Sequence, residues 1–453
     1  MADNFFKKVD FKNYSDTAIQ ERLDNMLASL NDVFSVSTSK NGTPIYSVWI
    51  KFAIGQESPV YFDSNSKIAE RNLIANLHMT KGQNGYANDF TLEIYYDAFR
   101  SGQETEATTV EKLDRWVADA MSYDYSEISN GFFTGKIQYG YNNLDDVDRQ
   151  LCTPVYSFYI TDASSETNFN SGITHYSFSG CAYLASDVNF IVNISKQEGR
   201  PLDVVQKVLK EYYEPIGYEI EISSDDLNAQ QTESIEPKQP TSSNPWQYCR
   251  EILNLYPLTQ AEKDSGNYTD EKLAEMKDGD KPRYIMYITE VDDNKKIHIK
   301  HSNYKYESKR RLKYKFEWTN TKNNLVTGWN PQVDLKTFLI RYASYTRNNI
   351  GQRTANMDKL FLLTHSQEEL NKIVREKTNT LKTNQIVEYY DATLECVGIP
   401  TDFPIGSYVE VVPTLFQTVS RTRGVYMIRG AEDTISTNGI FKTTITLYRT
   451  DSK

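Results

Sequence analysis

The feature that most constrains the fold of this chain is a pair of alternating segments near its C-terminal end, residues 424–450. In the second segment, the side chains that we expect to face a core occupy every second position: Phe441, Thr443, Ile445 and Leu447. Period-two alternation is typical of a strand with two different faces, and Asn438-Gly439 supplies the positive-φ backbone of a tight turn. The pattern predicts a β-hairpin with Phe441, Ile445 and Leu447 in the core of a C-terminal barrel and with Lys442 and Thr444 on the outer face.

Further strand-like segments occur along most of the chain: 46–54, 68–77, 89–96, 132–141, 155–161, 175–184, 284–291, 296–301, 312–318, 385–397 and 408–412. Helical periodicity occurs in fewer places: 15–30, 109–121, 201–214, 246–255 and a segment capped by Ser366 and Glu369. A capping pattern also pairs Thr108 with Glu111 at the start of the second helix. The sequence therefore predicts a mainly β fold with short helices, of the α+β class.

The length of 453 residues exceeds what one hydrophobic core usually serves, so three or four domains of about 100–150 residues are expected. The stretch 223–245 is polar and contains proline, which predicts a linker or a long exposed loop. Five regions are expected. Residues 1–80 form a helix with strands of unclear role, and 81–222 form a first β-barrel region with helices. The linker 223–245 is followed by a middle accessory domain, 246–345, and a C-terminal β-barrel, 346–453.

Charge and composition exclude some classes of function. The net charge of −11 argues against a nonspecific DNA-binding protein, because contacts to phosphates need a basic surface. A surface past which DNA slides without adhering remains compatible with that charge. The 32 tyrosines are explained equally well by large interfaces and by the preference of aromatic residues for strands, and the sequence leaves both open.

No membrane insertion is expected, since the chain has no run of about 18 consecutive apolar residues, and no signal-peptide core is expected at its start. The four cysteines lie far apart and form no CxxC pair: Cys152, Cys181, Cys249 and Cys396. This spacing predicts partly buried free thiols of a protein made in a reducing cytoplasm.

Each candidate for a chemical site has a simpler structural interpretation. His298 and His301 are three positions apart, so a strand would place them on opposite faces, where they cannot easily share a metal ion. The acidic stretches 144–148 and 291–294 lack the spacing of a calcium loop and are expected to be solvated turns. In 303–318, basic and aromatic residues interleave as in grooves for single-stranded nucleic acid, but the alternation favours a half-buried strand with a basic outer face.

The sequence contains no nucleophile elbow, phosphate-binding loop, zinc-protease motif or dinucleotide fingerprint. We therefore expect no catalytic, cofactor-binding or metal-ligating residues, and no enzymatic activity. A pair of catalytic carboxylates from distant segments would leave no linear signature, so a hydrolase remains an alternative.

A short sequence pattern recurs in the two halves of the chain. The segments "HYSFSG" (175–180) and "VYMIRG" (425–430) share the pattern Tyr-x-apolar-x-Gly, and each closes a group of strands that follows a helix. This recurrence is compatible with two related β-barrels in one chain.

The last 60 residues carry a more specific order of elements: a strand, Gly-Ile-Pro, Pro-Ile-Gly before a second strand, the Tyr-x-Ile-x-Gly strand, and the hairpin. This order resembles the closing barrel of baseplate hub proteins from contractile-tailed bacteriophages, and of the related spike proteins of type VI secretion. The segments "NDFTLEI", "HYSFSG" and "GRPLDVVQKVLKEYY" resemble the first barrel of those proteins more faintly. The residues that carry the barrel signature are structural: Pro404, Gly406, Tyr426, Gly430, Gly439, Phe441, Ile445 and Leu447.

The resemblance implies two barrels per chain that are similar to tail-tube subunits, with inserted or accessory domains. Three chains would then present six similar units, which adapts the hexameric tail tube to the trimeric central spike. The implied partners are two further copies of the chain, the tube protein, the spike protein, other baseplate proteins and viral DNA that passes through a bore without specific binding. The implied location is the virion tail baseplate, assembled in the cytoplasm of the host bacterium.

The sequence leaves alternatives open. Another structural part of the tail is the first, such as a tube, distal-tail or adhesin-carrying baseplate protein. A cell-wall hydrolase carried on the tail is the second.

Overall fold

The computed structural model describes most of the chain: residues 16–37, 46–55, 58–63, 73–81, 89–97, 104–121, 134–143, 151–181, 192–235, 244–269, 272–273, 281–291, 294–302, 311–318, 325–332, 392–415, 418–420 and 422–450. In these residues strands outnumber helices, and one antiparallel-rich sheet contains most of the strands. The mainly β, α+β fold class predicted from the sequence is confirmed. No helix in the described ranges is long and apolar enough to cross a membrane.

The N-terminal half of the sheet consists of seven antiparallel strands: β1 (Tyr46–Ile54), β2 (Val60–Asp63), β3 (Leu73–Lys81), β4 (Asp89–Asp97), β5 (Thr134–Asn143), β6 (Tyr156–Asn168) and β7 (Ile173–Cys181). They pair in the order β3-β4-β7-β6-β5-β1-β2. The sheet curls over a core. The ring centre of Phe52 in β1 lies 5.9 Å from that of Phe90 in β4 and 5.4 Å from that of Phe178 in β7, although these strands are not adjacent to β1. Helix α2 (Glu104–Met121) adds Trp116, whose ring lies edge-on to Phe52 at 5.6 Å.

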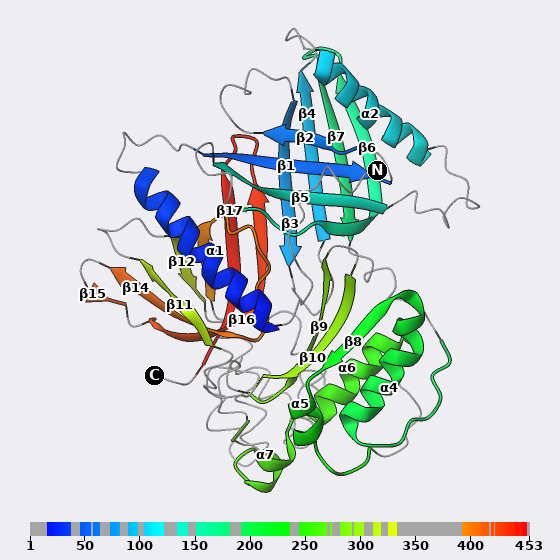
Figure 1. Ribbon diagram of the computed structural model, residues 1–453, viewed down its shortest axis with the longest axis vertical. Coiled ribbons are helices and arrows are strands. Elements are labelled where there is room, and N and C mark those ends of the chain that lie inside the picture. Colours follow the sequence, from blue (N-terminus) through cyan, green and yellow to red (C-terminus); the bar gives the residue numbers. More distant parts are fainter. Residues whose placement is uncertain are drawn as a thin grey trace, which may run out of the picture.

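The C-terminal half contains the remaining strands of the sheet: β11 (Arg311–Trp318), β12 (Val326–Pro331), β13 (Ala392–Val397), β14 (Tyr408–Leu415), β15 (Thr418–Val419), β16 (Gly424–Ile435) and β17 (Phe441–Arg449). This half also curls, since Trp329 of β12 packs edge-on against Tyr426 of β16 at 5.3 Å although two strands separate them. Helix α1 (Asp16–Ser37) lies beside these strands in Figure 1. The two halves are therefore each barrel-like in their packing.

Strand β16 joins the two halves into a single sheet (Figure 1). One of its edges pairs with β17 along nearly its whole length. The other edge pairs first with β14, from Gly424 to Met427, and then with β3, from Ala431 to Ile435. The change of partner coincides with a bulge between Ile428 and Gly430. Bulges bend and re-aim a strand, so this one directs β16 from its own half into the N-terminal half.

A separate α/β unit contains the middle of the chain: α4 (Pro201–Tyr213), η4 (Glu214–Ile216), β8 (Tyr218–Ile222), α5 (Ser224–Ala229), α6 (Pro245–Leu255), α7 (Gln260–Asp264), β9 (Tyr284–Val291) and β10 (Asn294–His301). Strand β10 lies between β8, which is parallel to it, and β9, which is antiparallel. Helices α4 and α6 lie side by side on this sheet, and Tyr213 meets Trp246 at 6.2 Å. Pro201 starts α4 without losing a needed donor, and Gly217 (φ +93°) turns the chain into β8.

This unit corrects the predicted domain boundaries. The stretch 223–245 was expected to be a linker or exposed loop, but α5 begins in it and four of its side chains are buried: Asp226, Gln230, Gln231 and Ile235. Gln230 accepts from the Leu202 backbone N–H at 2.8 Å, which ties the stretch to α4. Its polar side chains make internal hydrogen bonds, which composition alone cannot distinguish from exposure. The unit thus includes residues on both sides of the expected boundary.

Other boundaries differ as well. The expected N-terminal region 1–80 contributes β1, β2 and most of β3 to the first barrel-like half, and β11 and β12 belong to the C-terminal half rather than to a middle domain. Helix α2 begins at Glu104, so Thr108 lies inside the helix and is not its cap. The helix expected after Ser366 and the first part of the strand expected at 385–397 lie outside the described residues.

Candidate functional site

The β16–β17 hairpin has the two faces that its sequence predicts. Gly439 has φ +77° and donates its N–H to the Ser436 carbonyl at 2.8 Å, which closes the turn. Phe441, Ile445 and Leu447 are all buried, whereas Lys442, Thr444 and Thr446 are half-exposed. Tyr448 departs from the alternation, because it is buried as well.

Phe441 lies between the two halves. This position corrects the prediction that it faces the core of the C-terminal barrel. Its ring packs against two tyrosines of β5, with ring centres 5.6 Å apart for Tyr139 and 5.4 Å apart for Tyr141. A Cβ on Gly398 would collide with the Phe441 ring, so only glycine fits opposite it. The hydroxyl of Tyr141 donates to the Gly398 carbonyl at 3.0 Å. The end of the hairpin therefore packs against the N-terminal half.

A buried ion pair lies beside Phe441 at the same junction. Asp433 of β16 is fully buried and pairs with Lys81 of β3, which is 3% exposed. The Tyr139 hydroxyl donates to Asp433 Oδ2 at 2.6 Å, and the Thr443 hydroxyl donates to Asp433 Oδ1 at 2.6 Å. Burial, together with the negative charge of Asp433, raises the pKa of Tyr139 well above its ordinary value, so Tyr139 stays a neutral donor. We call these four side chains the junction cluster.

The loop between β13 and β14 is fixed to the junction cluster. Lys81 Nζ donates to the Thr401 carbonyl at 3.0 Å and lies 5.5 Å from the centre of the Tyr139 ring. The Tyr156 hydroxyl donates to Asp402 at 2.7 Å. Arg22 of α1 donates to the Thr401 hydroxyl at 3.2 Å. Local sequence patterns gave no indication of this cluster, because its members come from strands that are distant along the chain.

One signature residue of the same loop, Gly406, lies against the middle unit. Gly406 has φ +78°, and its N–H donates to the Ile428 carbonyl of β16 at 2.8 Å. A Cβ on Gly406 would lie 2.7 Å from Cδ1 of Ile285, which belongs to β9. The Pro404 carbonyl accepts from the Ser407 N–H at 3.0 Å, which shapes the turn. Gly406 thus marks where the middle unit packs on the C-terminal half, and Pro404 shapes the turn that presents it.

The remaining signature residues lie in β16. Tyr426 is buried, and its hydroxyl donates to the Thr422 carbonyl at 2.6 Å. Gly430 follows the bulge directly, and its carbonyl accepts from the Thr446 hydroxyl at 3.1 Å. The structure thus brings Phe441 and Gly439 to the end of the hairpin, and places Tyr426 and Gly406 within the C-terminal half.

The outer face of the continuous sheet is polar across both halves. Six adjacent strands contribute to it: β13, β17, β16, β3, β4 and β7. We call it the polar face, and its outward side chains are Thr393, Glu395, Lys442, Thr444, Thr446, Glu432, Thr434, Asn76, His78, Thr80, Thr91, Glu93, Tyr95, His175, Ser177 and Ser179. Hydroxyl side chains are the largest group, and glutamate is the commonest charged residue.

Contacts between neighbouring strands order the polar face. Lys442 forms an ion pair with Glu395 of the adjacent strand at 2.6 Å. Asn76 donates to Glu93 at 2.8 Å, and Tyr95 stacks on His175 with ring centres 4.6 Å apart. The one lysine of this set is therefore paired within its own sheet. A hydroxyl-rich face with paired charges offers little attraction to phosphates.

His298 and His301 have separate contacts. His298 lies 2.7 Å from the Thr289 hydroxyl and stacks on Tyr287, whereas His301 lies 3.0 Å from the Pro257 carbonyl. Within the described ranges, no group of three or more His, Cys, Asp or Glu side chains could hold a metal ion. The four cysteines are free thiols, and burial raises the pKa of the Cys249 and Cys396 thiols.

The basic and aromatic segment near residue 315 is a half-buried strand. Phe316 of β11 is buried, and its neighbours Lys315 and Glu317 are exposed and form an ion pair at 2.7 Å. The interpretation as an alternating strand is confirmed for these residues, and residues 303–310 lie outside the described ranges.

No protein-family model and no curated protein sequence matches the chain. Among solved structures, it is similar to the 43 kDa tail protein of prophage MuSo2 from Shewanella oneidensis, with 9% identity over 88% of this chain and 96% of that one, and a TM-score of 0.45. A tail protein from Neisseria meningitidis MC58 gives 10% identity, coverage of 89% and 96%, and a TM-score of 0.43.

A third similar structure is the E. coli c3393 protein, a type VI secretion component described as similar to the T4 bacteriophage tail proteins gp27 and gp5. It gives 8% identity, coverage of 83% of this chain and 74% of that one, and a TM-score of 0.38. In these three comparisons no identity exceeds 10% and no TM-score exceeds 0.45.

Proposed function

We propose that this chain is a structural baseplate hub of a contractile-tailed bacteriophage, which joins the hexameric tail tube to the trimeric central spike. The observation that carries the proposal is the continuous sheet whose polar face runs without interruption across two barrel-like halves. A ring of three such chains would contain six barrel-like units but only threefold symmetry. That combination suits a position between a sixfold and a threefold assembly.

The recurring sequence pattern supports the relatedness of the two halves. Both Tyr-x-apolar-x-Gly segments are interior strands of their half, β7 and β16. Each segment has its glycine at a bulge. Gly180 of β7 pairs with Ile160, beside a bulge between Ile160 and Asp162. Gly430 of β16 directly follows a bulge. Glycine next to a bulge permits close approach of a neighbouring group, and a Cβ on Gly180 would be too close to the Phe90 ring.

The polar face is proposed to line the bore through which DNA passes. The side chains named for this face include three glutamates and one paired lysine, with two histidines, and Asp89 at the start of β4 is exposed on the same side. The whole chain has a net charge of −11. A bore with such a lining would repel or ignore phosphates, so DNA would move without adhering. In this proposal the role is structural, and the partners are the tube protein, the spike protein and other baseplate proteins.

The ends of the sheet are proposed as sites of assembly. Within the described strands, the order of the sheet ends at β2 and at β12. The unpaired edge of a strand offers backbone donors and acceptors to a neighbouring chain. Pairing along these edges would extend the sheet from chain to chain around a ring.

Electron microscopy of the purified chain with its tube and spike proteins tests the proposal, together with mass measurement under native conditions. The expected result is a ring of three chains with an open bore along the threefold axis. A chain that stays monomeric with both partners present would overturn the hub. A sixfold ring would indicate a tube protein instead, and hydrolysis of peptidoglycan would indicate a cell-wall hydrolase.

A further inference from the structure

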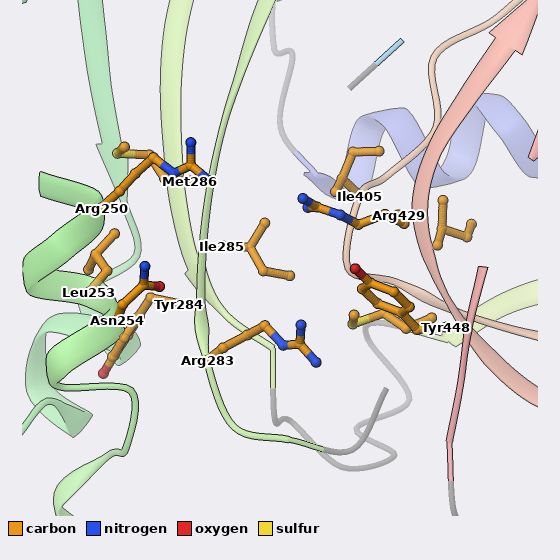
Figure 2. Close-up of a pocket in the computed structure, with 12 residues that line it drawn as sticks. Arg250, Leu253, Asn254, Arg283, Tyr284, Ile285, Met286, Ile405, Arg429 and Tyr448 are labelled. Carbon is orange, nitrogen blue, oxygen red and sulfur yellow. The ribbon is translucent and has the colours of Figure 1, made fainter. Parts of the chain in front are cut away.

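A pocket lies between the middle unit and the C-terminal half, and three arginines line it (Figure 2). Arg250 comes from α6, Arg283 precedes β9, and Arg429 comes from the bulge of β16. Figure 2 shows Arg250 on the side of the α6 helix and Arg429 beside Tyr448 on the opposite side, with Arg283 and Ile285 between them. Three separate segments thus bring positive charge to one place.

Among the described residues that line the pocket, none carries a carboxylate. Burial lowers the pKa of Arg429, Tyr448 opposes that shift, and the positive charges of Arg283 and Arg250 add to it. Mutual repulsion of the three guanidinium groups is therefore felt at Arg429. A chain of negative net charge has placed like charges together between two of its packed units.

Arg283 has unused hydrogen-bonding capacity. Its Nη2 atom is buried and has no hydrogen-bond partner among the residues that the structure describes. Its Nε atom lies 3.5 Å from the Lys281 carbonyl, and its Cζ atom lies 5.3 Å from the centre of the Tyr448 ring. A buried guanidinium N–H without an acceptor is costly, because charged donors lose strong hydrogen bonds to water. Within the described part of the chain, the Nη2 atom of Arg283 therefore lacks an acceptor.

We propose that this pocket binds a small tetrahedral oxyanion of the phosphate or sulfate class. Guanidinium groups present planar pairs of donors that match the oxygen atoms of such anions. The anion would accept from Arg283 Nη2, neutralise the repulsion at Arg429, and connect α6 to β16. It would act as a removable link between the middle unit and the C-terminal half. The proposal does not depend on the hub function.

Titration calorimetry of the full chain with inorganic phosphate tests the site, at constant ionic strength set with chloride. The Arg283→Met variant keeps the apolar stem beside Tyr448 but removes the guanidinium group. Arg423→Met is the matched control, because Arg423 is an exposed arginine of the same half that does not line the pocket. Thermal unfolding of each variant in phosphate and in chloride gives a second measurement.

The wild-type chain and Arg423→Met are expected to bind phosphate and to unfold at a higher temperature in phosphate than in chloride. Arg283→Met is expected to bind about tenfold more weakly or worse, which corresponds to one lost charge-assisted hydrogen bond. Equal phosphate effects in all three proteins, or none in the wild type, would overturn the proposal. If Arg283→Met does not fold, Arg283→Gln decides by the same comparison.

Discussion

Asp433 is a fully buried carboxylate that forms an ion pair with Lys81 and accepts hydrogen bonds from Tyr139 and Thr443. Removing one member of a buried ion pair leaves the other charge uncompensated. We expect Asp433→Ala to lower the free energy of unfolding by about 3–5 kcal/mol, because Lys81 would remain buried without its partner. Chemical denaturation measures the effect.

The exposed pair Lys442–Glu395 provides the matched control for that experiment. Lys442→Ala is expected to cost less than about 1 kcal/mol, since exposed ion pairs contribute little. A cost for Asp433→Ala as small as that for Lys442→Ala would show that the junction cluster is not a buried ion pair in solution.

Phe441 gives a second prediction at the scale of the residue. Phe441→Ala is expected to cost about 3–5 kcal/mol through lost burial and a cavity between Tyr139 and Tyr141. Thermal unfolding beside Lys442→Ala measures the difference. Equal unfolding temperatures for the two variants would mean that the register of β17 is wrong.

At the scale of the element, the β13–β14 loop meets β9 at Gly406. Gly406→Ala introduces both a strained backbone at φ +78° and a Cβ only 2.7 Å from Ile285. The matched control is Gly266→Ala, where φ is +61° but a Cβ would meet nothing within 4 Å. The control isolates the backbone cost of about 1–2 kcal/mol.

We expect Gly406→Ala to lower the free energy of unfolding more than Gly266→Ala does, because β9 must move away to relieve the contact. Chemical denaturation of both variants gives the comparison. Equal costs would show that the middle unit does not press on this loop in solution.

At the scale of the whole molecule, the polar face and the junction cluster lie on opposite sides of the same strands. The inner side chains of β3, β16 and β17 connect these strands to one another and to β5, and their outer side chains face the proposed bore. Alternation along each strand separates the two roles, so the outer face can vary without disturbing the core.

Charge reversal on the polar face tests its proposed function in the assembled ring. Glu432→Lys places a lysine between Thr80 and Thr444, and Glu432→Gln is the control that only removes the negative charge. Assembled Glu432→Lys is expected to retain duplex DNA at low salt and to release it as salt rises, whereas the wild type and Glu432→Gln retain none. Fluorescence anisotropy of labelled DNA measures retention. Identical retention by all three would argue against this face as the bore.

The sequence by itself determined the local elements. The bounds predicted for the strands at 46–54 and 284–291 agree with those of β1 and β9, and the alternation indicates the buried positions of β17 from Phe441 to Leu447. These features depend on neighbours two to four positions away, so composition and periodicity reveal them. The turn at Gly439 was equally local, since its backbone requires glycine.

Only the tertiary structure decided how the elements meet. Tyr139 and Asp433 are 294 positions apart, and no local pattern indicates that a tyrosine in β5 donates to a carboxylate in β16. For the same reason Phe441 was expected in its own barrel but packs on the other half, and the polar stretch 223–245 was expected to be exposed although Gln230 is buried. Alternation tells which face of a strand is buried, but not against which strand. The partners follow from the closure of hydrogen bonds and the filling of space across the whole chain.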